Sequence, residues 1–527
     1  MTAAPQLKLV PKDTNHDIDK LIEETAAGVE ESRFALAVRE KGGVDYVPPS
    51  GPMRFNDIAN AERFLTEFGG NLLFCVETQS WMIYLNGFWK KDDTFFVTDY
   101  ARMWAKAELE NALPEGDKQR IKNADRLNND AGFNAMIKQS KYQRAITISK
   151  FDAPPTHYLL NCKNCTIDLK TGEERKHARE DFITRSVAVE WQGKEAECPT
   201  FEAFLEDIQP DPEIREFLKR SVGYSLLGVV RERSFWILYG SGNNGKSIFT
   251  NLLLQILGPY GCTTTSETIM DMKRPGGSAN SDIARLKGKR FVLIPETNEN
   301  ERLNAALLKA LSAGDVITAR HLYGEFFDFP FTGKMWIATN HKPTVTDHSK
   351  GFWDRLKLVP FTTNISDSKV VKSDVLLARL MAEAPGILAW AVRGCIEYLE
   401  KDSLDVPAVI QREIDQYKFE QDSIAQFLAN ACQTWEQFVA ISEQSRAYAT
   451  EADFQVPNKE LYDAYLKYCK ENGEFPRSHK RLSQNMQERG FRQGRSGSRY
   501  WEGVRLIRKT KQRRNCCLAL FAAAKRH

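Results

Sequence analysis

The 527-residue sequence contains no apolar run of about 18 residues, the length that a membrane-spanning helix needs. Its first residues, MTAAPQLKLVPKDTNHD, include no apolar stretch of the kind that directs export. Only ten cysteines are scattered along the chain, which predicts reduced thiols and a cytoplasmic protein. Neither sign of charge dominates, because the net charge is only +3. Membrane and disulfide-rich secreted proteins are therefore disfavoured, and any nucleic-acid binding must come from local patches.

One pair of cysteines, Cys162 and Cys165 in NCKNC, has a spacing that is typical of metal sites. A structural zinc ion needs about four ligands. No second pair follows; the next cysteine is the isolated Cys198. The sequence therefore favours two ordinary thiols in a strand and turn over a zinc site.

The composition is that of a globular protein, with 42% hydrophobic and 27% charged residues, and the length predicts three or four domains. Apolar patterning and turn signals divide the chain into a flexible arm (1–50), a mixed α+β domain (51–200), an α/β domain (201–365), a helical connector (366–425), a small basic domain (426–508) and a tail with no assigned role (509–527).

Short strands can be placed from their residue types. The stretch from Trp81 to Trp89 alternates strand-forming residues around Asn86-Gly87, which predicts a β-hairpin. The segments SFWILY (234–239), RFVLIPE (290–296) and KMWIATN (334–340) are apolar throughout, as buried parallel strands are. The 201–365 region is therefore expected to be an α/β domain built on a mainly parallel sheet.

A phosphate-binding loop follows the first of these strands. Its residues match G-x-x-x-x-G-K-[ST] and are Gly240, Ser241, Gly242, Asn243, Asn244, Gly245, Lys246 and Ser247, with Ile248 next in the helix. Glycines let backbone N–H groups turn toward phosphate oxygens. The lysine supplies a cation to the phosphates and the serine hydroxyl can bind Mg²⁺. The competing interpretation is a glycine-rich turn between a strand and a helix.

Hydrolysis of a triphosphate also needs groups at neighbouring strand ends. Glu296 closes the second apolar strand, so we expect it to hold Mg²⁺ together with Ser247 or to activate water, with Glu299 as a helper. Asn340 closes the third strand and either contacts the γ-phosphate or simply forms a turn. Arg355 is a candidate arginine finger, the alternative being a surface arginine paired with Asp354.

The region from Glu471 to Arg514 is strongly basic. It has thirteen Lys and Arg against four acidic residues, a local net charge of +9 that exceeds that of the whole chain. The pattern predicts a helix near 479–489 followed by a two-stranded wing. Arg492, Arg495 and Arg499 in the wing are candidate DNA contacts, and a solubilising charged face is the alternative.

The order of these motifs resembles the helicase part of the phage and plasmid primase-helicases, within superfamily 3 of the AAA+ ATPases. The resemblance rests on GSGNNGKS, then ARLKGKRFVLIPETNE, LLKALSAGDVITARHLYGEFFDF, WIATNHKP and GFWDRLKLVPF, and it extends more weakly over residues 55–508. It implies an AAA+ core, the family's amino-terminal domain before it and a winged helix after it.

The resemblance also implies roles for residues. By this resemblance, Lys246 and Ser247 belong to the first motif, Glu296 is the second-motif acid and Asn340 is the sensor. Arg355 is implied to reach into the next subunit of a ring, for which a hexamer is expected. Four residues are implied candidates for contacting single-stranded DNA, namely Arg320, His321, Tyr323 and Lys334.

The implied activity is that of an ATP- and Mg²⁺-dependent replicative DNA helicase of a phage, prophage or plasmid, moving 3′ to 5′ on single-stranded and forked DNA. A separate primase or loader is an expected partner, no membrane partner is expected, and we expect no primer synthesis by this chain. Two other functions stay open: an ATP-switched, origin-binding initiator and a P-loop phosphotransferase.

Overall fold

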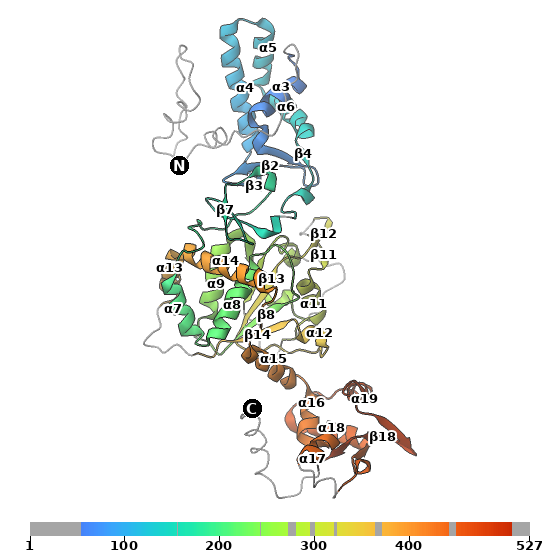
Figure 1. The fold of residues 1–527 in the computed structure, drawn as a ribbon. Coiled ribbons are helices and arrows are strands. Elements are labelled where there is room, and N and C mark those ends of the chain that lie inside the picture. The colour runs from blue at the N-terminus through green and yellow to red at the C-terminus, as the bar shows by residue number, and fades with distance from the viewer. Residues whose placement is uncertain are drawn as a thin grey trace. The chain divides into compact units, whose positions relative to one another are not determined.

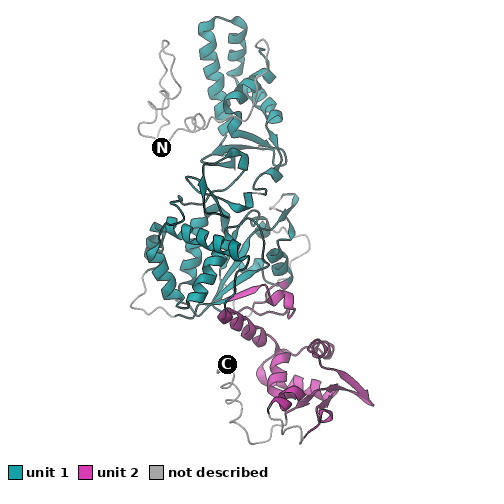
Figure 2. Ribbon diagram, in the orientation of Figure 1, with its two compact units in different colours: residues 1–298, 306–341, 359–407 teal, residues 299–305, 342–358, 408–527 magenta. Residues whose placement is uncertain are grey.

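The computed structural model describes residues 54–154, 156–242, 244–271, 281–295, 301–320, 324–363, 372–441 and 449–507. Contacts divide the chain into two units, drawn in different colours in Figure 2. Unit 1 comprises 1–298, 306–341 and 359–407, and unit 2 comprises 299–305, 342–358 and 408–527. The predicted arm (1–50) and tail (509–527) lie outside the described residues.

Unit 1 begins with a four-stranded sheet covered by helices. Its elements are α3 (Asp57–Phe68), β1 (Leu72–Cys75), β2 (Ser80–Leu85), β3 (Phe88–Lys91), α4 (Phe96–Glu115), α5 (Lys118–Leu127), α6 (Asp130–Gln143) and β4 (Ala145–Ile146). The strand order is β3–β2–β1–β4, and only β4 runs parallel to its neighbour. The predicted hairpin is confirmed: Asn86 and Gly87 both have positive φ between β2 and β3.

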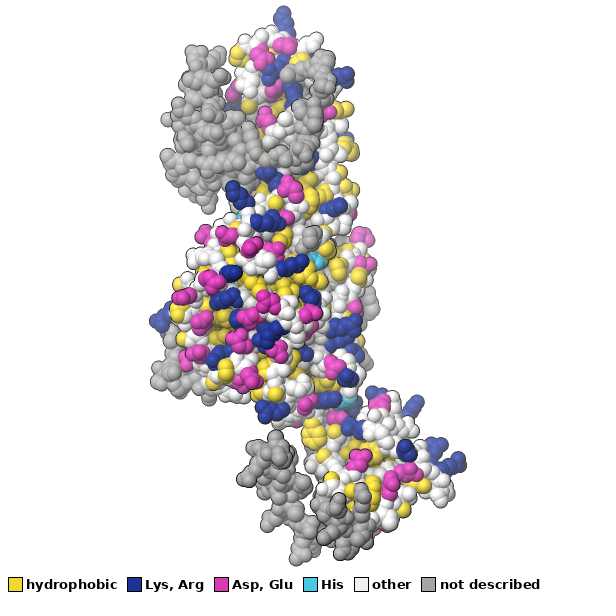
Figure 3. All heavy atoms as spheres, in the orientation of Figure 1, with side chains coloured by type: hydrophobic (Ala, Val, Ile, Leu, Met, Phe, Trp, Pro, Cys, Tyr) yellow, Lys and Arg dark blue, Asp and Glu magenta, His cyan; other side chains and the backbone are white. Residues whose placement is uncertain are grey.

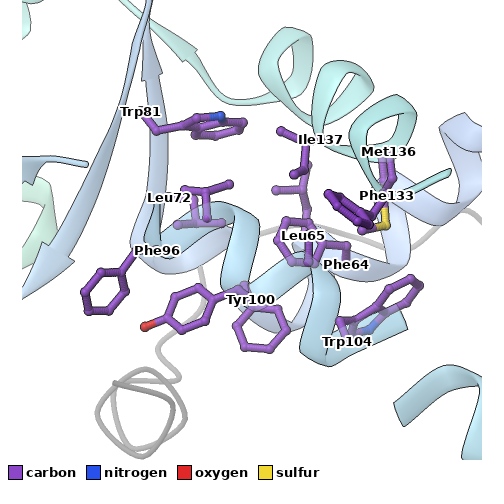
Figure 4. Packing of buried hydrophobic residues seen from close by; sticks show 14 of the residues in the cluster. Phe64, Leu65, Leu72, Trp81, Phe96, Tyr100, Trp104, Phe133, Met136 and Ile137 are labelled. Atoms are coloured by element: carbon purple, nitrogen blue, oxygen red, sulfur yellow. The ribbon is translucent and has the colours of Figure 1, made fainter. Parts of the chain in front are cut away.

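Side-chain caps set where these helices begin. Asn56 accepts a hydrogen bond from the Ala59 N–H at 2.9 Å, and Asp117 and Asn129 cap α5 and α6 in the same way. Behind the caps, apolar faces pack into a core of aromatic and aliphatic side chains, in which Phe64 lies 5.3 Å from Phe68 and 6.2 Å from Trp104 between ring centroids (Figure 4). This core belongs to the amino-terminal part of unit 1 alone.

A small antiparallel sheet leads to the larger part of unit 1. It consists of β5 (Leu159–Asn161), β6 (Thr166–Asp168) and β7 (Glu174–Arg175). Arg290, which precedes the strand β10 described below, donates hydrogen bonds to the Leu159 carbonyl at 2.8 Å and to the Leu226 carbonyl at 2.6 Å. Its guanidinium is buried over the Tyr260 ring. Arg290 therefore joins the small sheet to the region that follows.

The next region is the predicted α/β domain with a parallel sheet. Its strands are β8 (Phe235–Tyr239), β9 (Gly261–Thr263), β10 (Phe291–Pro295), β13 (Lys334–Thr339) and β14 (Leu356–Pro360). They are ordered β14–β8–β13–β10–β9, and β8, β13, β10 and β9 are mutually parallel. Figure 1 labels β8, β13 and β14 of this sheet. The three apolar segments chosen from the sequence are thus confirmed as adjacent buried strands.

Two stacked tryptophans fix the register of β8 against β13. Trp236 and Trp336 are paired residues, and their rings stack at 4.9 Å with a 7° angle between planes. Both are fully buried, so each indole N–H needs an acceptor. Ser221 and Ser225 on α8 (Pro212–Ser225) supply those acceptors at 3.0 and 3.1 Å. The helix and the two strands are therefore held as one block.

Other helices and a hairpin surround the sheet. They are α7 (Pro199–Ile208), α9 (Lys246–Leu257), α10 (Ser281–Ala284), α11 (Ala305–Ala313), α13 (Ser373–Ala382) and α14 (Ala384–Lys401), with the antiparallel pair β11 (Val316–Arg320) and β12 (Phe326–Pro330). Among the described residues no single helix is both long and apolar enough to cross a membrane; α13 and α14 pass that test only jointly and meet at a 72° bend.

Unit 2 contains α12 (Lys350–Trp353) and a compact carboxy-terminal region. The latter consists of α15 (Ala408–Glu420), α16 (Ser423–Ala431), β15 (Cys432–Thr434), α17 (Trp435–Ile441), β16 (Gln455–Pro457), α18 (Asn458–Asn472), α19 (His479–Glu488), β17 (Gln493–Ser496), β18 (Ser498–Glu502) and β19 (Val504–Leu506). Leu461, Tyr465 and Trp501 are in its core. The predicted helix and wing are confirmed as α19 and the β17–β18 hairpin.

Replacing Phe64 by Ala should destabilise the amino-terminal part of unit 1 by about 3–5 kcal/mol, because a fully buried aromatic ring would leave a cavity. Denaturant unfolding followed by fluorescence measures this. Ile58→Ala on the same helix is the control, since Ile58 is 55% exposed and its loss should change stability by less than about 0.5 kcal/mol. Equal effects of the two substitutions would contradict the assigned core.

Candidate functional site

The loop between β8 and α9 is shaped by two glycines. A Cβ atom on Gly240 would lie 2.0 Å from the Phe361 carbonyl oxygen, which leaves no room for any side chain. Gly245 has a φ of +77°, and a Cβ there would lie 2.4 Å from Cγ2 of Ile208. The sequence pattern thus places glycine where the backbone requires it, and α9 begins directly afterwards at Lys246.

The side chain of Lys246 is folded against this loop. It is 5% exposed, and its Nζ donates to the Gly240 carbonyl at 2.6 Å and to Asn244 Oδ1 at 2.9 Å. A third hydrogen bond, of 3.4 Å, reaches Oδ1 of Asn340. Lys246 and Asn340, which are 94 positions apart and were selected from the sequence on separate grounds, are therefore in contact.

Asn340 follows β13, whose parallel pairing with β8 places Thr339 opposite Tyr239. The sequence left open whether Asn340 forms a turn or faces the loop. In the structure, Thr339 makes turn hydrogen bonds: its hydroxyl donates to the His341 carbonyl at 2.8 Å and accepts from the His341 N–H at 3.3 Å. The amide oxygen of Asn340 accepts from Lys246 instead.

The exposed groups beside the lysine come from the start of α9 and the end of β10. The side chain of Ser247 is exposed in the first turn of the helix, and that of Ile248 is half-buried. β10 ends at Pro295, which pairs with Ala338 of β13. Five predicted site residues lie outside the described residues, namely Asn243, Glu296, Glu299, His321 and Tyr323.

The loop is also held by residues that are distant from it in the sequence. The sequence motif gave no indication of these residues. Asn244 Nδ2 donates to the Phe361 carbonyl at 2.9 Å, and Gln209 Nε2 donates to the neighbouring Pro360 carbonyl at 2.6 Å. The Phe361 N–H in turn donates to the Tyr239 carbonyl at 2.8 Å. No local signal marks Gln209 or Phe361, because their role depends on backbone atoms brought together by the sheet.

Lys334 does not have the surface position that contact with DNA requires. Its side chain is 2% exposed, and Nζ donates to the carbonyls of Leu227 at 2.5 Å, Val229 at 2.9 Å and Thr332 at 3.1 Å. Burial, and secondarily the charge of Arg290, hold its pKa well below the usual value. The sequence-based proposal for Lys334 is therefore corrected: this lysine satisfies buried carbonyls at the amino end of β13.

Arg320 and Arg355 are both half-buried. Arg320 ends β11, and its guanidinium lies over the ring of Phe326, 4.8 Å from the ring centre. Arg355 belongs to unit 2 and follows α12, with its N–H donating to the Phe352 carbonyl at 3.1 Å. The nearby Asp354 carboxylate lies 3.8 Å from Lys350 Nζ.

The three arginines predicted for the wing are all exposed (Figure 3). Arg495 on β17 lies directly opposite Arg499 on β18, with Gly497 at the tip. Like charges in directly opposed positions of a hairpin repel each other and destabilise the pair. Arg492 precedes β17 on the same segment. This hairpin is thus a concentrated positive surface in unit 2.

The Cys162–Cys165 pair forms a tight turn, in which the Cys162 N–H donates to the Cys165 carbonyl at 2.8 Å. Both thiols are buried. The contact with Cys165, and then burial, raise the pKa of Cys162. Within the described part of the chain, no group of three or more His, Cys, Asp or Glu side chains is arranged to hold a metal ion.

Comparisons with known families match two segments of the chain. Residues 61–210 match a family described as "D5 N terminal like", and residues 238–355 match a "Family of unknown function (DUF5906)". The second segment contains the loop, the lysine and Asn340. The chain is therefore similar to two separate family models, one on each side of residue 220.

Individual relatives are viral proteins. The chain is 30% identical over 250 residues to "Putative helicase L207/L206" of Acanthamoeba polyphaga mimivirus, covering 47% of this chain and 26% of that protein. It is 28% identical over 241 residues to "Putative helicase 022R" of Frog virus 3 (43% and 25% covered), and 25% identical over 238 residues to "Putative primase C962R" of African swine fever virus (44% and 24% covered). The chain spans about a quarter of the length of these relatives.

Among solved structures, the apo C-terminal region of NrS-1 (305–718) is similar over 86% of this chain and 99% of that one, with a TM-score of 0.48 and 12% identity. Over about 240–250 residues, the chain is thus similar to viral proteins that are named putative helicases and putative primases.

Replacing Lys334 by Met should lower the stability of unit 1 by about 1–3 kcal/mol, because buried carbonyls would lose their donor. The affinity of the folded variant for a single-stranded oligonucleotide should stay within twofold of wild type. Thermal unfolding and fluorescence anisotropy measure the two effects. A tenfold loss of affinity with unchanged stability would restore a DNA contact for Lys334.

Proposed function

We propose that the chain is an ATP-dependent DNA helicase of a replication system. The observation that carries the proposal is the contact of Lys246 with Gly240 and Asn340 in a loop where two glycines leave no space for side chains. A lysine, a helix N-terminus and an amide at the carboxyl edge of a parallel sheet are suited to the phosphates of a nucleotide. The helicase names of the viral relatives agree with this.

The residues of the loop fit Mg²⁺-ATP. Gly240 and Gly245 let the loop pack against Phe361 and Ile208 with no room for a Cβ, and Lys246 already binds oxygen acceptors of the kind that a phosphate presents. Ser247, exposed at the start of α9, and Glu296 would hold Mg²⁺, which stabilises negative charge on the phosphates. Asn340 would orient the γ-phosphate or the attacking water, and Glu296 would accept a proton from that water.

Arg355 is the proposed arginine finger, which would act on the nucleotide bound by a neighbouring subunit. It follows α12 in unit 2, whereas Lys246 and Asn340 belong to unit 1. A finger that must cross between subunits makes hydrolysis depend on assembly, which is the arrangement of AAA+ rings of superfamily 3. We infer a hexameric ring that encircles one strand.

The carboxy-terminal region would bind DNA as a winged helix. A helix, α19, precedes a hairpin in which Arg495 faces Arg499, and the repulsion between them is relieved if phosphates lie against both. Arg492 extends the same surface. Arg320, His321 and Tyr323 remain proposed contacts for the strand in the ring. Translocation 3′ to 5′ and unwinding of forked DNA follow as the proposed activity.

Substituting Arg355 by Ala should reduce ATP turnover by about 10³–10⁵-fold while nucleotide binding persists, because the finger stabilises transition-state charge. Lys246→Ala should abolish turnover through loss of phosphate binding. Mixing the two variants should recover part of the activity, since some interfaces then combine an intact loop with an intact finger. A steady-state phosphate-release assay with single-stranded DNA measures all three.

Lys350→Ala is the matched control for the Arg355 experiment, because Lys350 lies five residues away and its side chain is 90% exposed. It should retain the wild-type rate. Absence of any recovery on mixing would rule out a finger acting between subunits. Nucleotide binding with scarcely any hydrolysis would favour the origin-binding initiator, and a requirement for a small acceptor would favour a phosphotransferase.

Removing both wing arginines, Arg495→Ala with Arg499→Ala, should flatten the dependence of log affinity for duplex DNA on log salt by about 1.8, since each neutralised phosphate contributes about 0.9. Anisotropy titrations from low to moderate salt measure this slope. Lys467→Ala is the control, because Lys467 is an exposed cation on α18 of the same unit. An unchanged slope in the double variant would assign the hairpin to solubility alone.

A further inference from the structure

The segment that leads to Arg355 is built into unit 2. Residues 342–358 share most of their contacts with 301–305 and with the carboxy-terminal region from residue 408 onward, as the common colour in Figure 2 shows. The segment begins two residues after Asn340. It therefore connects the proposed sensor in unit 1 to a part of the molecule that the proposed function assigns to DNA.

Tyr417 on α15 holds the segment at two points. Its hydroxyl donates to the Pro343 carbonyl, and its ring packs edge-on against Trp353 with 5.4 Å between centroids. The Trp353 indole N–H donates to the Asp347 carbonyl at 3.1 Å. Pro343 and Trp353 lie at opposite ends of the segment, so one fully buried tyrosine fixes both.

The end of α15 adds two polar contacts. Gln421 Oε1 accepts from the Val345 N–H at 2.9 Å, and the Glu420 carboxylate lies 3.2 Å from Lys342 Nζ. Thr344, between them, is bound through its backbone to residues 301–303: its N–H donates to the Glu301 carbonyl at 2.9 Å and its carbonyl accepts from the Leu303 N–H at 3.0 Å. The first half of the segment is thus bound on both sides.

Near its middle, the segment directly contacts the region that precedes α19. Arg477 Nη2 lies 3.3 Å from Nε2 of His348. A guanidinium has only donors, so the histidine nitrogen must be the acceptor and the ring must be neutral. Burial lowers the pKa of His348, as do the charges of Arg477 and Arg489, against the opposing effects of Asp422 and Asp347. The neutral ring that the contact requires is therefore favoured.

Arg477 is itself anchored to the core of the carboxy-terminal region. Its N–H donates to the Tyr465 hydroxyl at 3.2 Å, and its carbonyl accepts from the Tyr462 hydroxyl at 3.3 Å, both on α18. Ser478, the next residue, caps α19. A displacement of α19 or of the loop before it would move Arg477. Because Arg477 contacts His348 directly, His348 would move as well.

From His348 the path to Arg355 is short. Phe352 and Trp353 in α12 are buried, and the Arg355 N–H donates to the Phe352 carbonyl at 3.1 Å. We propose that His348 and Tyr417 are positioning residues for Arg355, and that polynucleotide bound to the carboxy-terminal region acts on ATP turnover through this segment. The inference rests on the proposed function, in that it takes Arg355 as the finger and the carboxy-terminal region as a DNA-binding element.

The test compares wild type, His348→Ala and Lys350→Ala in the full-length chain. With wild type and Lys350→Ala, single-stranded oligonucleotide should stimulate ATP turnover equally. With His348→Ala, ATP turnover in the presence of oligonucleotide should fall at least fivefold, because Arg355 is then misplaced, while KM for ATP and oligonucleotide affinity stay within twofold. A loss of ATP binding and of oligonucleotide affinity together with turnover, or a turnover equal to wild type, would overturn the inference, since a purely structural role predicts the former and no role the latter.

Tyr417 provides a second, graded pair of variants. Tyr417→Phe keeps the ring against Trp353 and loses only the bond to Pro343, so it should retain at least half of the stimulation. Tyr417→Ala removes both contacts and should lose it. If Tyr417→Phe were as defective as Tyr417→Ala, the packing against Trp353 would not be the positioning contact.

Amide hydrogen exchange separates this inference from the proposed function. In wild type, oligonucleotide should change the exchange of the Thr344, Val345 and Phe352 amides, and in His348→Ala the change should be reduced. Such a change without any ATP turnover would contradict the proposed helicase while supporting transmission from the carboxy-terminal region to residues 342–358. If oligonucleotide stimulated ATP turnover in wild type but left amide exchange in residues 342–358 unaltered, the result would contradict the coupling through this segment and would agree with the proposed helicase function.

Discussion

The stacking of Trp236 on Trp336 is the contact on which the candidate site depends. The two residues are paired between β8 and β13, and in this register the two serines of α8 satisfy both buried indole N–H groups. Because the strands are parallel, a fixed register also fixes which residues emerge together at their carboxyl ends. Lys246 and Asn340 meet there as a consequence.

The opposite edge of the sheet is occupied by two buried cations. Arg290 and Lys334 stand at the amino ends of β10 and β13, and both donate to backbone carbonyls of other segments. Burying a cation costs free energy unless its N–H groups find hydrogen-bond acceptors. Here the acceptors are carbonyls of the small antiparallel sheet (β5–β7) and of the residues at the end of α8, so the two side chains join these parts to the central strands. The amino edge of the sheet is thus occupied by structural contacts, which include those of Lys334, and the candidate site lies at the carboxyl edge.

Unit 2 combines a basic surface with the segment that carries Arg355. Residues 342–358 contact α15 and the residue after it, and they contact Arg477 just before α19. A catalytic group must be placed to within a fraction of an ångström and benefits from a rigid support. If Arg355 is the finger that we propose, the carboxy-terminal region would supply that support.

The sequence by itself determined the loop, its lysine, the three buried strands, the hairpin at Asn86-Gly87 and the basic wing, because each depends on local residue types and short-range periodicity. It also placed Asn340 at a strand end but could not choose between a turn and a site residue. Only the tertiary structure brought Asn340 to Lys246, moved Lys334 from a surface role to a buried one, and revealed Gln209, Phe361 and His348 as supports. These roles depend on atoms more than a hundred residues apart in several cases, and a linear pattern carries no record of which distant carbonyl a side chain will meet.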